Sequence, residues 1–406
     1  ISSVAMANFD VVVVGIGGHG SAALYHLAKR GFKVLGLEQF SIAHDLGSSH
    51  GHSRIIRLQY HEHPDYVPLL RRAYELWHKL EAESGQVALF LERNQLLYTT
   101  GCLEFADKAN ADSVFANALR SAMEHGLEHE VLSSEEANAR FPGFHIPSNF
   151  MALYQPQGGI LSPEKCIKAH VERAVQHGAT VHTEEKVLAW HVLPSGNVEV
   201  RTAKGAYTAS KLVVTAGAWI PQLVPELQGI AAVQRQVIGW FEVSDHEAFS
   251  TDNFPVFILE DETLGEYYGF PEFDGLPGMK IGKFYHLYEP CEQPDNLTRI
   301  ITSADEEVLR AAVKKYFPKA DGKMCKAVAC MFTNTPDKRF IVDFHPEHPQ
   351  VVLCSACSGH GYKFCSVIGE ILADLVVKGS TALNIDLHRI SKSRKATRDI
   401  AGSLSR

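Results

Sequence analysis

The pattern of apolar and polar positions predicts α/β segments at both ends of the chain and a strand-rich middle. Residues 9–14 (FDVVVV) form a continuous β-branched run, which is typical of a strand buried on both faces. Residues 21–30 (SAALYHLAKR) have the spacing of an amphipathic helix that ends at Gly31. Residues 33–37 predict a second strand, so the chain begins with a strand–turn–helix–strand unit.

The same patterns recur further along the chain. Helical spacing predicts helices over residues 68–84, 106–127, 162–176, 303–316 and 367–377. Runs of β-branched and apolar residues predict strands over residues 180–183, 187–192, 198–202, 211–215, 327–333, 340–344 and 351–355. Between residues 224 and 288 the sequence changes to short aromatic-rich strands joined by turns. Because 406 residues exceed one ordinary core, we expect the two ends to form one discontinuous domain and the middle another.

Composition excludes several classes of protein. The chain has 39 Lys and Arg against 47 Asp and Glu, and this net charge of −8 gives no electrostatic footprint for nucleic acid. No apolar run approaches the roughly 18–20 residues of a membrane-spanning helix. Eight cysteines, with no secretory signal, favour a reduced compartment. We expect a cytoplasmic protein, or a peroxisomal one in a eukaryote, because one Leu after Arg406 would give the signal Ser-Arg-Leu.

A glycine motif follows the first predicted strand. Gly15, Gly17 and Gly20 have the GxGxxG spacing, which allows a tight turn, the approach of a pyrophosphate and close helix packing. The N-terminus of the following helix offers free N–H groups to phosphates. Glu38 ends the next strand, eighteen residues after Gly20, where an acid binds ribose hydroxyls and disfavours a 2′-phosphate. This unit predicts FAD or NAD as the cofactor.

Three more segments combine small residues with charged or aromatic ones. The run 47–57 (GSSHGHSRIIR) holds Arg54 and Arg57, which suit a carboxylate, although a solvated basic turn is the alternative. The turn 214–219 (VTAGAW) either lets the backbone lie close to a flat ligand or only packs. The turn 358–363 (SGHGYK) enters a helix whose N-terminus either stabilises negative charge on a ligand or only opens the helix.

Together these segments resemble the monomeric sarcosine oxidase family, which includes N-methyltryptophan and pipecolate oxidases of the D-amino-acid oxidase superfamily. The resemblance extends from Phe9 to Phe364 through FDVVVVGIGGHGSAALYHLAKRG, GSSHGHSRIIR, LVVTAGAW, YYGFPEF, CMFTNTPDKRFIVDFHPEH and SGHGYKF. It implies an α/β fold, α+β overall, with a glutathione-reductase-like FAD-binding Rossmann domain and an antiparallel-sheet substrate domain. We expect the FAD-binding domain over residues 1–86, 151–222 and 325–406 and the substrate domain over residues 87–150 and 223–324.

The resemblance implies roles for individual residues. Cys330, in CMFT, matches the cysteine that binds FAD covalently through its 8α-methyl group. Lys280 matches the lysine that activates oxygen, because a fixed ammonium stabilises superoxide. Arg57 and Lys363 match the pair that holds the substrate carboxylate. The expected catalytic set is completed by His50, Tyr268 and His286.

Two positions depart from the family pattern. Phe332 replaces a tyrosine and removes a hydroxyl near the substrate. The family commonly reads Lys-x-Gly-Tyr-His after the oxygen-activating lysine, whereas this chain reads KIGKFYH, so that His286 lies two places later. The other residues expected to bind FAD are Gly15, Gly17, Gly20, Glu38, Gln39, Ser48, Ser49, Ser53, Arg54, Val187, Gly217, Trp219, Gly359, His360, Gly361 and Lys363.

Some features that resemble metal or redox motifs receive no role. Cys354 and Cys357 form a CxxC, but there is no second pair to bind zinc, and we expect no redox function. The run 345–348 (HPEH) lies where the family carries a similar loop without metal, so we expect no metal site. We expect His61 and His63 to be surface residues.

The resemblance implies an FAD-dependent amine oxidase. We expect oxidation of a secondary amine on a small amino acid, such as sarcosine, another N-methyl amino acid, proline or pipecolate, with release of hydrogen peroxide. The expected partners are this substrate and molecular oxygen, with no nucleic acid and no membrane, and the expected state is a monomer. The alternatives are a D-amino-acid or glycine oxidase-like enzyme acting on primary amines, an amine dehydrogenase that does not use oxygen, and an inactive binding homologue.

Overall fold

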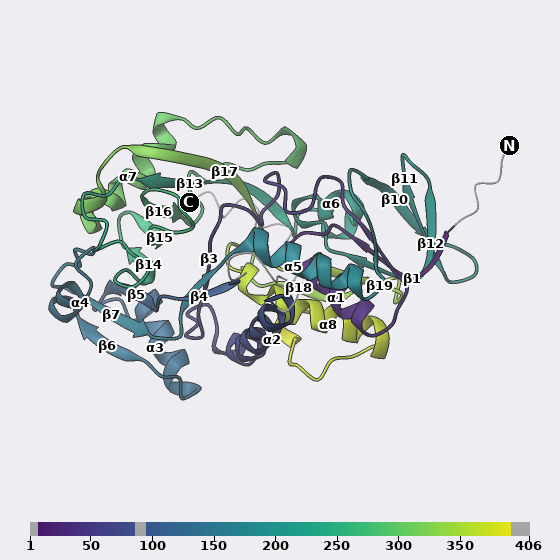
Figure 1. Cartoon of the computed structure of the whole chain (residues 1–406), viewed down its shortest axis with the longest axis horizontal. Helices are drawn as coiled ribbons and strands as arrows, with labels where there is room; N and C mark the ends of the chain where they lie inside the picture. Colours follow the sequence, from purple (N-terminus) through teal and green to yellow (C-terminus); the bar gives the residue numbers. More distant parts are fainter. Residues whose placement is uncertain (1–6, 86–94, 391–406) are drawn as a thin grey trace.

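Two large β-sheets form the two ends of the molecule, with helices packed around them (Figure 1). The computed structural model describes residues 7–85 and 95–390. Each large sheet has eight strands. A third sheet has three strands, and none of them pairs with a strand of either large sheet. The small sheet consists of β3 (Arg54–Ile56), β8 (Gly159–Leu161) and β4 (Leu97–Thr99).

The first large sheet contains the predicted N-terminal unit. Its parallel strands are β9, β2, β1, β12 and β19, and antiparallel strands extend it beside β12 and β19. The strands of this sheet are β1 (Ala7–Val14), β2 (Val34–Leu37), β9 (Thr180–His182), β10 (Val187–Val192), β11 (Val198–Thr202), β12 (Ala206–Val214), β18 (Ile341–Phe344) and β19 (Val351–Ser355). The strand order brings residues from the beginning, middle and end of the chain into one layer.

Strand β1 shows why this sheet is buried on both faces. Val11 and Val13 pack into the core formed with the helices, whereas Val12 and Val14 pack into a second core on the opposite face. This follows from the two-residue period of a strand, which points successive side chains to opposite faces. The continuous β-branched run therefore predicted the strand correctly.

Helices surround the sheets, and α1 packs against both α5 and α8. Local signals explain where several of them begin and end: Ser133 and Glu136 form a capping box at α4, and Gly379 ends α8 in the left-handed conformation. The helices are α1 (Gly18–Lys29), α2 (Val67–Gly85), α3 (Val114–Glu124), α4 (Ser134–Arg140), α5 (Pro163–Gln176), α6 (Ile220–Leu223), α7 (Ser303–Tyr316) and α8 (Cys365–Lys378).

The second large sheet is antiparallel except for one parallel pair, β5 with β14. Its order is β17-β13-β16-β15-β14-β5-β7-β6. The strands are β17 (Met324–Asn334), β13 (Ala232–Phe241), β16 (Met279–Lys283), β15 (Gly265–Phe270), β14 (Val256–Asp261), β5 (Cys102–Asp107), β7 (Phe150–Gln155) and β6 (Glu130–Ser133). A separate aromatic-rich core lies against this sheet and α7. The predicted combination of a Rossmann-like sheet and an antiparallel sheet is confirmed.

Most predicted elements lie where the sequence placed them, but the helix expected over residues 106–127 is wrong at its N-terminal side. Strand β5 extends to Asp107, and α3 begins only at Val114. Ser113 caps that helix by accepting a hydrogen bond from the N–H of Ala116, which fixes the start of the helix locally. Only Ala106 and Asp107, the last two residues of β5, fall within the expected helical range.

Two of the expected domain boundaries fall inside strands of the second sheet. The boundary after residue 150 lies in β7, and the boundary after residue 324 lies in β17. Both strands pair along their length with members of the second sheet. We therefore propose that the substrate domain continues through Gln155 and that the last FAD-domain segment begins after Asn334.

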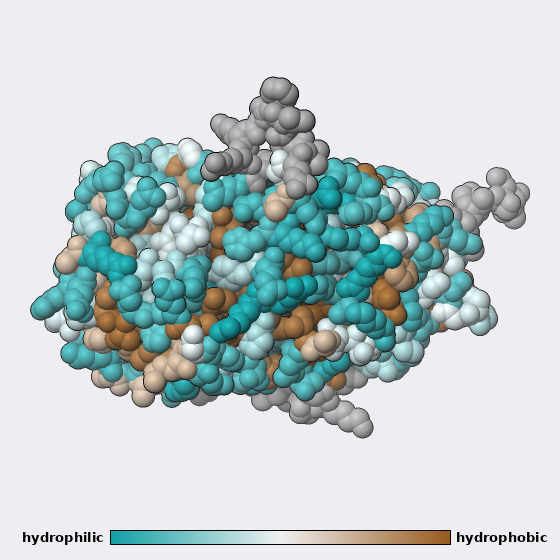
Figure 2. All heavy atoms as spheres, turned by 60° about the horizontal axis from the view of Figure 1, so that its bottom comes forward, coloured by the Kyte–Doolittle hydropathy of each residue, from teal (hydrophilic) through white to brown (hydrophobic). Residues whose placement is uncertain are grey.

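Hydrophilic residues dominate the face of the molecule in Figure 2, with hydrophobic residues in scattered areas between them. Within residues 7–85 and 95–390, no helix has the length and apolar character needed to span a bilayer. All eight cysteines lie in the described ranges, and all have free thiols. No group of His, Cys, Asp or Glu in these ranges is arranged to hold a metal ion.

Candidate active site

The glycine turn between β1 and α1 is packed as its spacing predicts. A Cβ on Gly20 would overlap the carbonyl oxygen of Gly15, so α1 can approach the strand only through a glycine. Gly15 has φ +85°, and a Cβ there would lie 2.7 Å from the carbonyl oxygen of Thr215. Gly17 differs, because a Cβ on it would meet no atom closer than 3.9 Å. The turn therefore packs tightly at two glycines and faces open space at the third.

Replacing Gly20 by alanine should lower the free energy of unfolding by about 1–3 kcal/mol, the usual cost of overpacking. Gly205→Ala is the matched control, because a Cβ on Gly205 meets no atom within 4 Å. Urea unfolding of both variants would measure the difference. Equal stability of the two variants would contradict the packing role assigned to Gly20.

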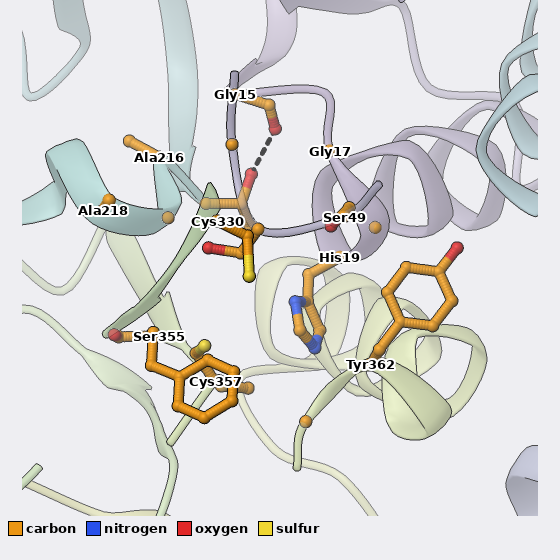
Figure 3. Close-up of a pocket in the computed structure, with 18 of the residues that line it drawn as sticks. Gly15, Gly17, His19, Ser49, Ala216, Ala218, Cys330, Ser355, Cys357 and Tyr362 are labelled. Carbon is orange, nitrogen blue, oxygen red and sulfur yellow. Dashed lines mark hydrogen bonds between the residues drawn. The ribbon is translucent and has the colours of Figure 1, made fainter. Parts of the chain in front are cut away.

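A pocket lies beside this turn and takes its lining from both large sheets; Figure 3 shows part of that lining. Residues of β16 and β17 line it together with the glycine turn and the loop between β19 and α8. The sequence-predicted residues that line it are Gly15, Gly17, Glu38, Gln39, Ser48, Ser49, Arg54, Arg57, Val187, Gly217, Trp219, Tyr268, Lys280, Cys330, Gly359, His360, Gly361 and Lys363. Segments more than 300 residues apart in the sequence thus meet at one cavity.

Glu38 is fixed at one end of the pocket. Its Oε2 accepts a hydrogen bond from the N–H of Ile16 at 2.8 Å, and its Oε1 accepts one from the N–H of Phe40 at 3.0 Å. The first bond ties the end of β2 directly to the glycine turn. Gln39 and Val187 line the pocket beside it. The carboxylate is therefore held in place at the position that the motif predicts for ribose binding.

Lys280 projects from β16 into a buried site and is 2% exposed. Its Nζ donates to the carbonyl oxygen of Gly51 at 2.7 Å and to the carbonyl and hydroxyl oxygens of Ser53 at 3.0 and 2.8 Å. The ring of Phe270 lies 4.4 Å from the same Nζ. Burial, followed by the Arg54 cation, lowers the pKa of Lys280 well below its usual value. The amine is held rigidly beside the pocket.

Four predicted site residues do not line the pocket formed by the described residues. Gly20 packs behind the glycine turn, and Ser53 contributes by holding Lys280. His50 is buried, and burial together with Arg54 lowers its pKa to about 3, so it is neutral. His286 lies elsewhere.

His286 is placed away from the pocket because the chain turns after β16. Tyr285 and His286 both have positive φ, 58° and 21°, and the Nε2 of His286 lies 2.9 Å from the Oδ1 of Asp305. Arg235 donates to the same carboxylate. Phe284 lines the pocket instead. We therefore do not retain His286 in the candidate site.

Cys330 lies on β17, opposite Gln236 of β13, and its side chain lines the pocket (Figure 3). Burial raises the pKa of its thiol, while the nearby Arg54 and Lys280 cations oppose that shift. Arg54 itself is fixed, because its guanidinium donates to the carbonyl oxygens of Ser53 and Ser48, each at 2.8 Å. The thiol therefore faces the cavity close to two positively charged side chains.

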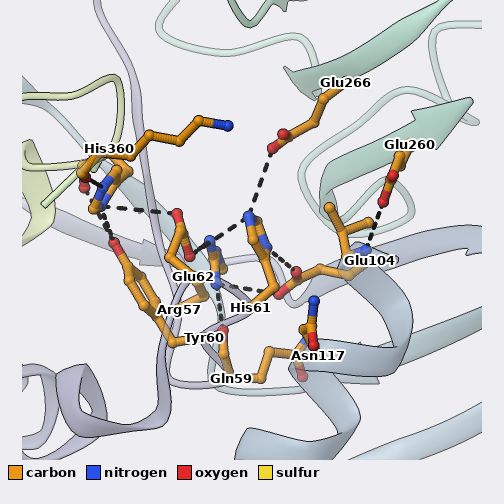
Figure 4. Close-up of polar contacts among 12 residues, drawn as sticks. Arg57, Gln59, Tyr60, His61, Glu62, Glu104, Asn117, Glu260, Glu266 and His360 are labelled. Atoms are coloured by element: carbon orange, nitrogen blue, oxygen red, sulfur yellow. Dashed lines mark hydrogen bonds and ion pairs between the residues drawn. The ribbon is translucent and has the colours of Figure 1, made fainter. Parts of the chain in front are cut away.

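Arg57 is the centre of a buried polar cluster that also contains His61, Glu62, Glu104 and Glu266 (Figure 4). Its guanidinium donates to Glu62 at 2.8 Å and lies 3.4 Å from Glu104, which is 0% exposed. Burial opposes ionisation of Glu62, but the neighbouring cationic groups, Arg57 first among them, together outweigh burial and hold the pKa of Glu62 below its usual range. The cluster therefore supplies a fixed guanidinium at the wall of the pocket.

Lys363 lies in the turn that enters α8 and lines the same part of the pocket. Its Nζ donates to the carbonyl oxygen of His360 at 2.7 Å and lies 5.3 Å from the ring of Tyr60. The guanidinium of Arg57 stacks over that ring at 4.3 Å. Two cations therefore flank one aromatic ring, which is suitable for binding a carboxylate.

Comparison with known proteins agrees with this geometry. Residues 10–375 match the family described as FAD dependent oxidoreductase. The chain is 41% identical over 390 residues to monomeric sarcosine oxidase of Bacillus sp. (strain B-0618), covering 95% of this chain and 96% of that protein. It is 33% identical over 391 residues to human peroxisomal sarcosine oxidase, with coverage of 95% and 96%. The chain belongs to the monomeric sarcosine oxidase family of FAD-dependent oxidoreductases.

Solved structures show the same fold at lower sequence identity. An amino acid oxidase of nikkomycin biosynthesis has a TM-score of 0.79 and 24% identity, covering 95% of this chain and 98% of that one. Glycine oxidase from Geobacillus kaustophilus has a TM-score of 0.77 and 18% identity, with coverage of 95% and 99%. The fold of this sarcosine oxidase family member is thus shared by other amino acid oxidases, a glycine oxidase among them.

The pocket fits the FAD of this family at several points. Gly17 and Gly217 face open space where a Cβ would meet no close atom. The Nε2 of His19 is buried, lines the pocket and has no hydrogen-bond partner among the described residues. Burial lowers the pKa of His19 to about 4, so the ring is neutral and can donate or accept one hydrogen bond to a ligand. The open backbone at the N-terminus of α1 lets a pyrophosphate approach, and the Nε2 of His19 is available to a bound ligand.

Sequence reasoning missed several residues of this sarcosine oxidase family site. His19, Glu62 and Phe284 all line the pocket but belong to none of the assigned roles. His61 was expected at the surface, yet its side chain is only 9% exposed because it lies against Glu104 and Glu62. The position of His19 inside the glycine motif was the available signal for that residue.

The pKa of Lys363 predicts a pH dependence for carboxylate binding. Burial, followed by the Arg57 cation, lowers this pKa to about 7. Lys363 is therefore charged below that pH and loses its charge as the pH rises. The inhibition constant of propionate, which carries a carboxylate but no amine, should increase as the pH rises above about 7. If the inhibition constant of propionate had the same pH dependence in Lys363→Met as in the wild type, another group would be responsible for the effect.

Proposed function

We propose that the chain oxidises a secondary amine on a small amino acid, such as an N-methyl or cyclic amino acid, and releases hydrogen peroxide. FAD supplies the two-electron oxidation of the C–N bond and the return of those electrons to oxygen. The observation that carries the proposal is one pocket that holds a buried lysine, Lys280, and a separate cation pair, Arg57 and Lys363. The sarcosine and N-methyl-L-tryptophan oxidases among the relatives of this chain support the substrate class.

The substrate-binding part of the proposal rests on Arg57 and Lys363. Arg57 is held by Glu62 and the carbonyl oxygen of Gln59, so its guanidinium needs little reordering to accept a carboxylate. Two cations beside the substrate also lower the pKa of its ammonium group, which favours the neutral amine that reacts. Tyr268 lines the same pocket and completes the proposed substrate site.

Lys280 is proposed to serve the oxygen step. Its three hydrogen bonds to the 51–53 loop fix the position of Nζ. A preorganised cation in a buried site stabilises negative charge that develops on oxygen, at no cost in reorganisation. Arg54 holds the same loop through Ser48 and Ser53.

Cys330 is proposed to carry FAD through a covalent bond from its Sγ to the 8α-methyl group. Acid precipitation of the purified protein should leave the yellow colour in the pellet, on the Cys330 peptide. Cys330→Ala should release the colour into the supernatant, whereas Cys357→Ala, a thiol that lines the same pocket, should not. Colour retained in the Cys330→Ala pellet would place the attachment elsewhere.

One assay separates this function from the alternatives left open by the sequence. Sarcosine and glycine, each supplied with oxygen, would be compared by peroxide formation and by flavin reduction without oxygen. Preference for sarcosine with peroxide release supports the proposal. Preference for glycine favours a glycine oxidase-like enzyme, and flavin reduction without peroxide favours a dehydrogenase. No reduction by either amine, or by N-methyl-L-leucine, proline or pipecolate, favours an inactive homologue. The monomeric state and the cytoplasmic or peroxisomal location stay predictions.

A further inference from the structure

Three aromatic rings form one wall of the pocket, and we infer that they select a secondary amino acid with an apolar skeleton larger than that of sarcosine. This inference rests on the proposed function. Phe284 packs edge-on against Tyr268, with 5.2 Å between ring centroids, and its centroid lies 5.9 Å from that of Phe332. All three rings line the pocket, as does Cys330, two residues before Phe332. We call these rings the aromatic wall.

The aromatic wall lies next to the proposed carboxylate site. A Cβ on Gly359 would lie 2.8 Å from both Phe284 and Phe332, so the two rings pack directly on this loop. The next residue is His360, whose carbonyl oxygen accepts the hydrogen bond from Lys363. A substrate whose carboxylate meets Lys363 therefore has this apolar wall within reach of its carbon skeleton.

Two of the three rings stand where the family pattern has polar side chains. Phe284 occupies the fourth position after Lys280, which is the histidine of the Lys-x-Gly-Tyr-His pattern, and Phe332 occupies the tyrosine of the Cys-Met-Tyr-Thr pattern. Phe284 directly follows the last residue of β16, and its N–H donates to the carbonyl oxygen of Glu266 at 2.9 Å, so the alternation that points Lys280 to the pocket extends to Phe284. Among the three rings only Tyr268 keeps a polar group.

Replacing these polar side chains by phenylalanine changes which substrate side chains the pocket favours. Phenylalanine offers a substrate no hydrogen bond, so a polar substituent would lose its water without replacement, whereas an apolar substituent gains by burial. One additional methylene in a complementary apolar pocket changes kcat/KM by about tenfold or more. The aromatic wall therefore favours an N-methyl amino acid with an apolar side chain over sarcosine and over an N-methyl amino acid with an acidic side chain.

The test compares kcat/KM for N-methyl-L-leucine, sarcosine and N-methyl-L-aspartate by peroxide release from the flavin-bearing enzyme. N-methyl-L-leucine should exceed each of the others by about tenfold or more. Phe284→His and Phe332→Tyr, which restore the family's residues, should each lower the leucine-to-sarcosine ratio several-fold. Phe273→His is the matched control, because Phe273 packs against Tyr98 outside the pocket and should leave the ratio unchanged.

The outcomes separate this inference from the proposed function. A wild-type preference for sarcosine, or for N-methyl-L-aspartate, would overturn the inference and leave the oxidase assignment intact. A ratio unchanged in both Phe284→His and Phe332→Tyr, with the flavin spectrum retained, would also overturn it. Failure of these three amino acids, and also of proline and pipecolate, to reduce the flavin would overturn both conclusions.

Discussion

Lys280→Met should slow the reaction of the reduced enzyme with oxygen by about 10²–10³-fold or more, because it removes a fixed cation where negative charge develops. Flavin reduction by the amine should remain largely intact, since Lys280 bonds to the 51–53 loop and is not part of the Arg57–Lys363 pair. Stopped-flow mixing, first with substrate under anaerobic conditions and then with oxygen, would separate the two rates. Lys283→Met, on the same strand but outside the pocket, is the control.

The oxygen step should also depend on pH in a definite direction. Because burial lowers the pKa of Lys280, the charged form is lost at a lower pH than for a free lysine. The rate of reoxidation should therefore fall as the pH rises, and this fall should be absent in Lys280→Met. Oxygen reactivity in the variant equal to that of the wild type would remove the proposed role.

Arg57→Met should lower the free energy of unfolding by about 3–5 kcal/mol, because it breaks a buried ion pair on one side only. Glu104, at 0% exposure, would keep His61 as its partner but lose the guanidinium, and Glu62 would lose its hydrogen bond. Denaturant unfolding measures the change, and kcat/KM for the amine should fall at the same time.

The control for Arg57 is Arg72→Met. Arg72 pairs with Glu370 and Glu75, but its side chain is 37% exposed, so the loss should stay within about 1 kcal/mol. Similar destabilisation by the two substitutions would show that the buried cluster contributes no more than a surface ion pair.

The sequence alone predicted best those parts of the site that depend on the spacing of neighbouring residues. Gly15, Gly17 and Gly20 have separate steric roles that follow from their positions between a strand and a helix, and the structure places each accordingly. Cys330 and Lys280 were found only through the resemblance, since a buried thiol or a lysine in a strand carries no signal of its own. Both line the pocket as expected.

The parts that could not be predicted depend on contacts between distant segments. Glu104 follows Arg57 by 47 residues, and nothing in the sequence around Glu104 indicates that the two side chains lie close together. The resemblance assigned His286 to the site although it lies two places later than the family's histidine. Two residues with positive φ turn the chain away after β16, and Phe284, which occupies the matching fourth position after Lys280, lines the pocket instead.

The pocket takes its walls from both large sheets, with the glycine turn on one and Cys330 on the other. A cofactor that fills it therefore contacts both halves of the molecule, which have separate hydrophobic cores. Its contacts with the two halves form together only when both halves are folded, which couples their unfolding. We therefore expect the loaded protein to melt in one transition, whereas the empty protein should melt earlier and in two steps.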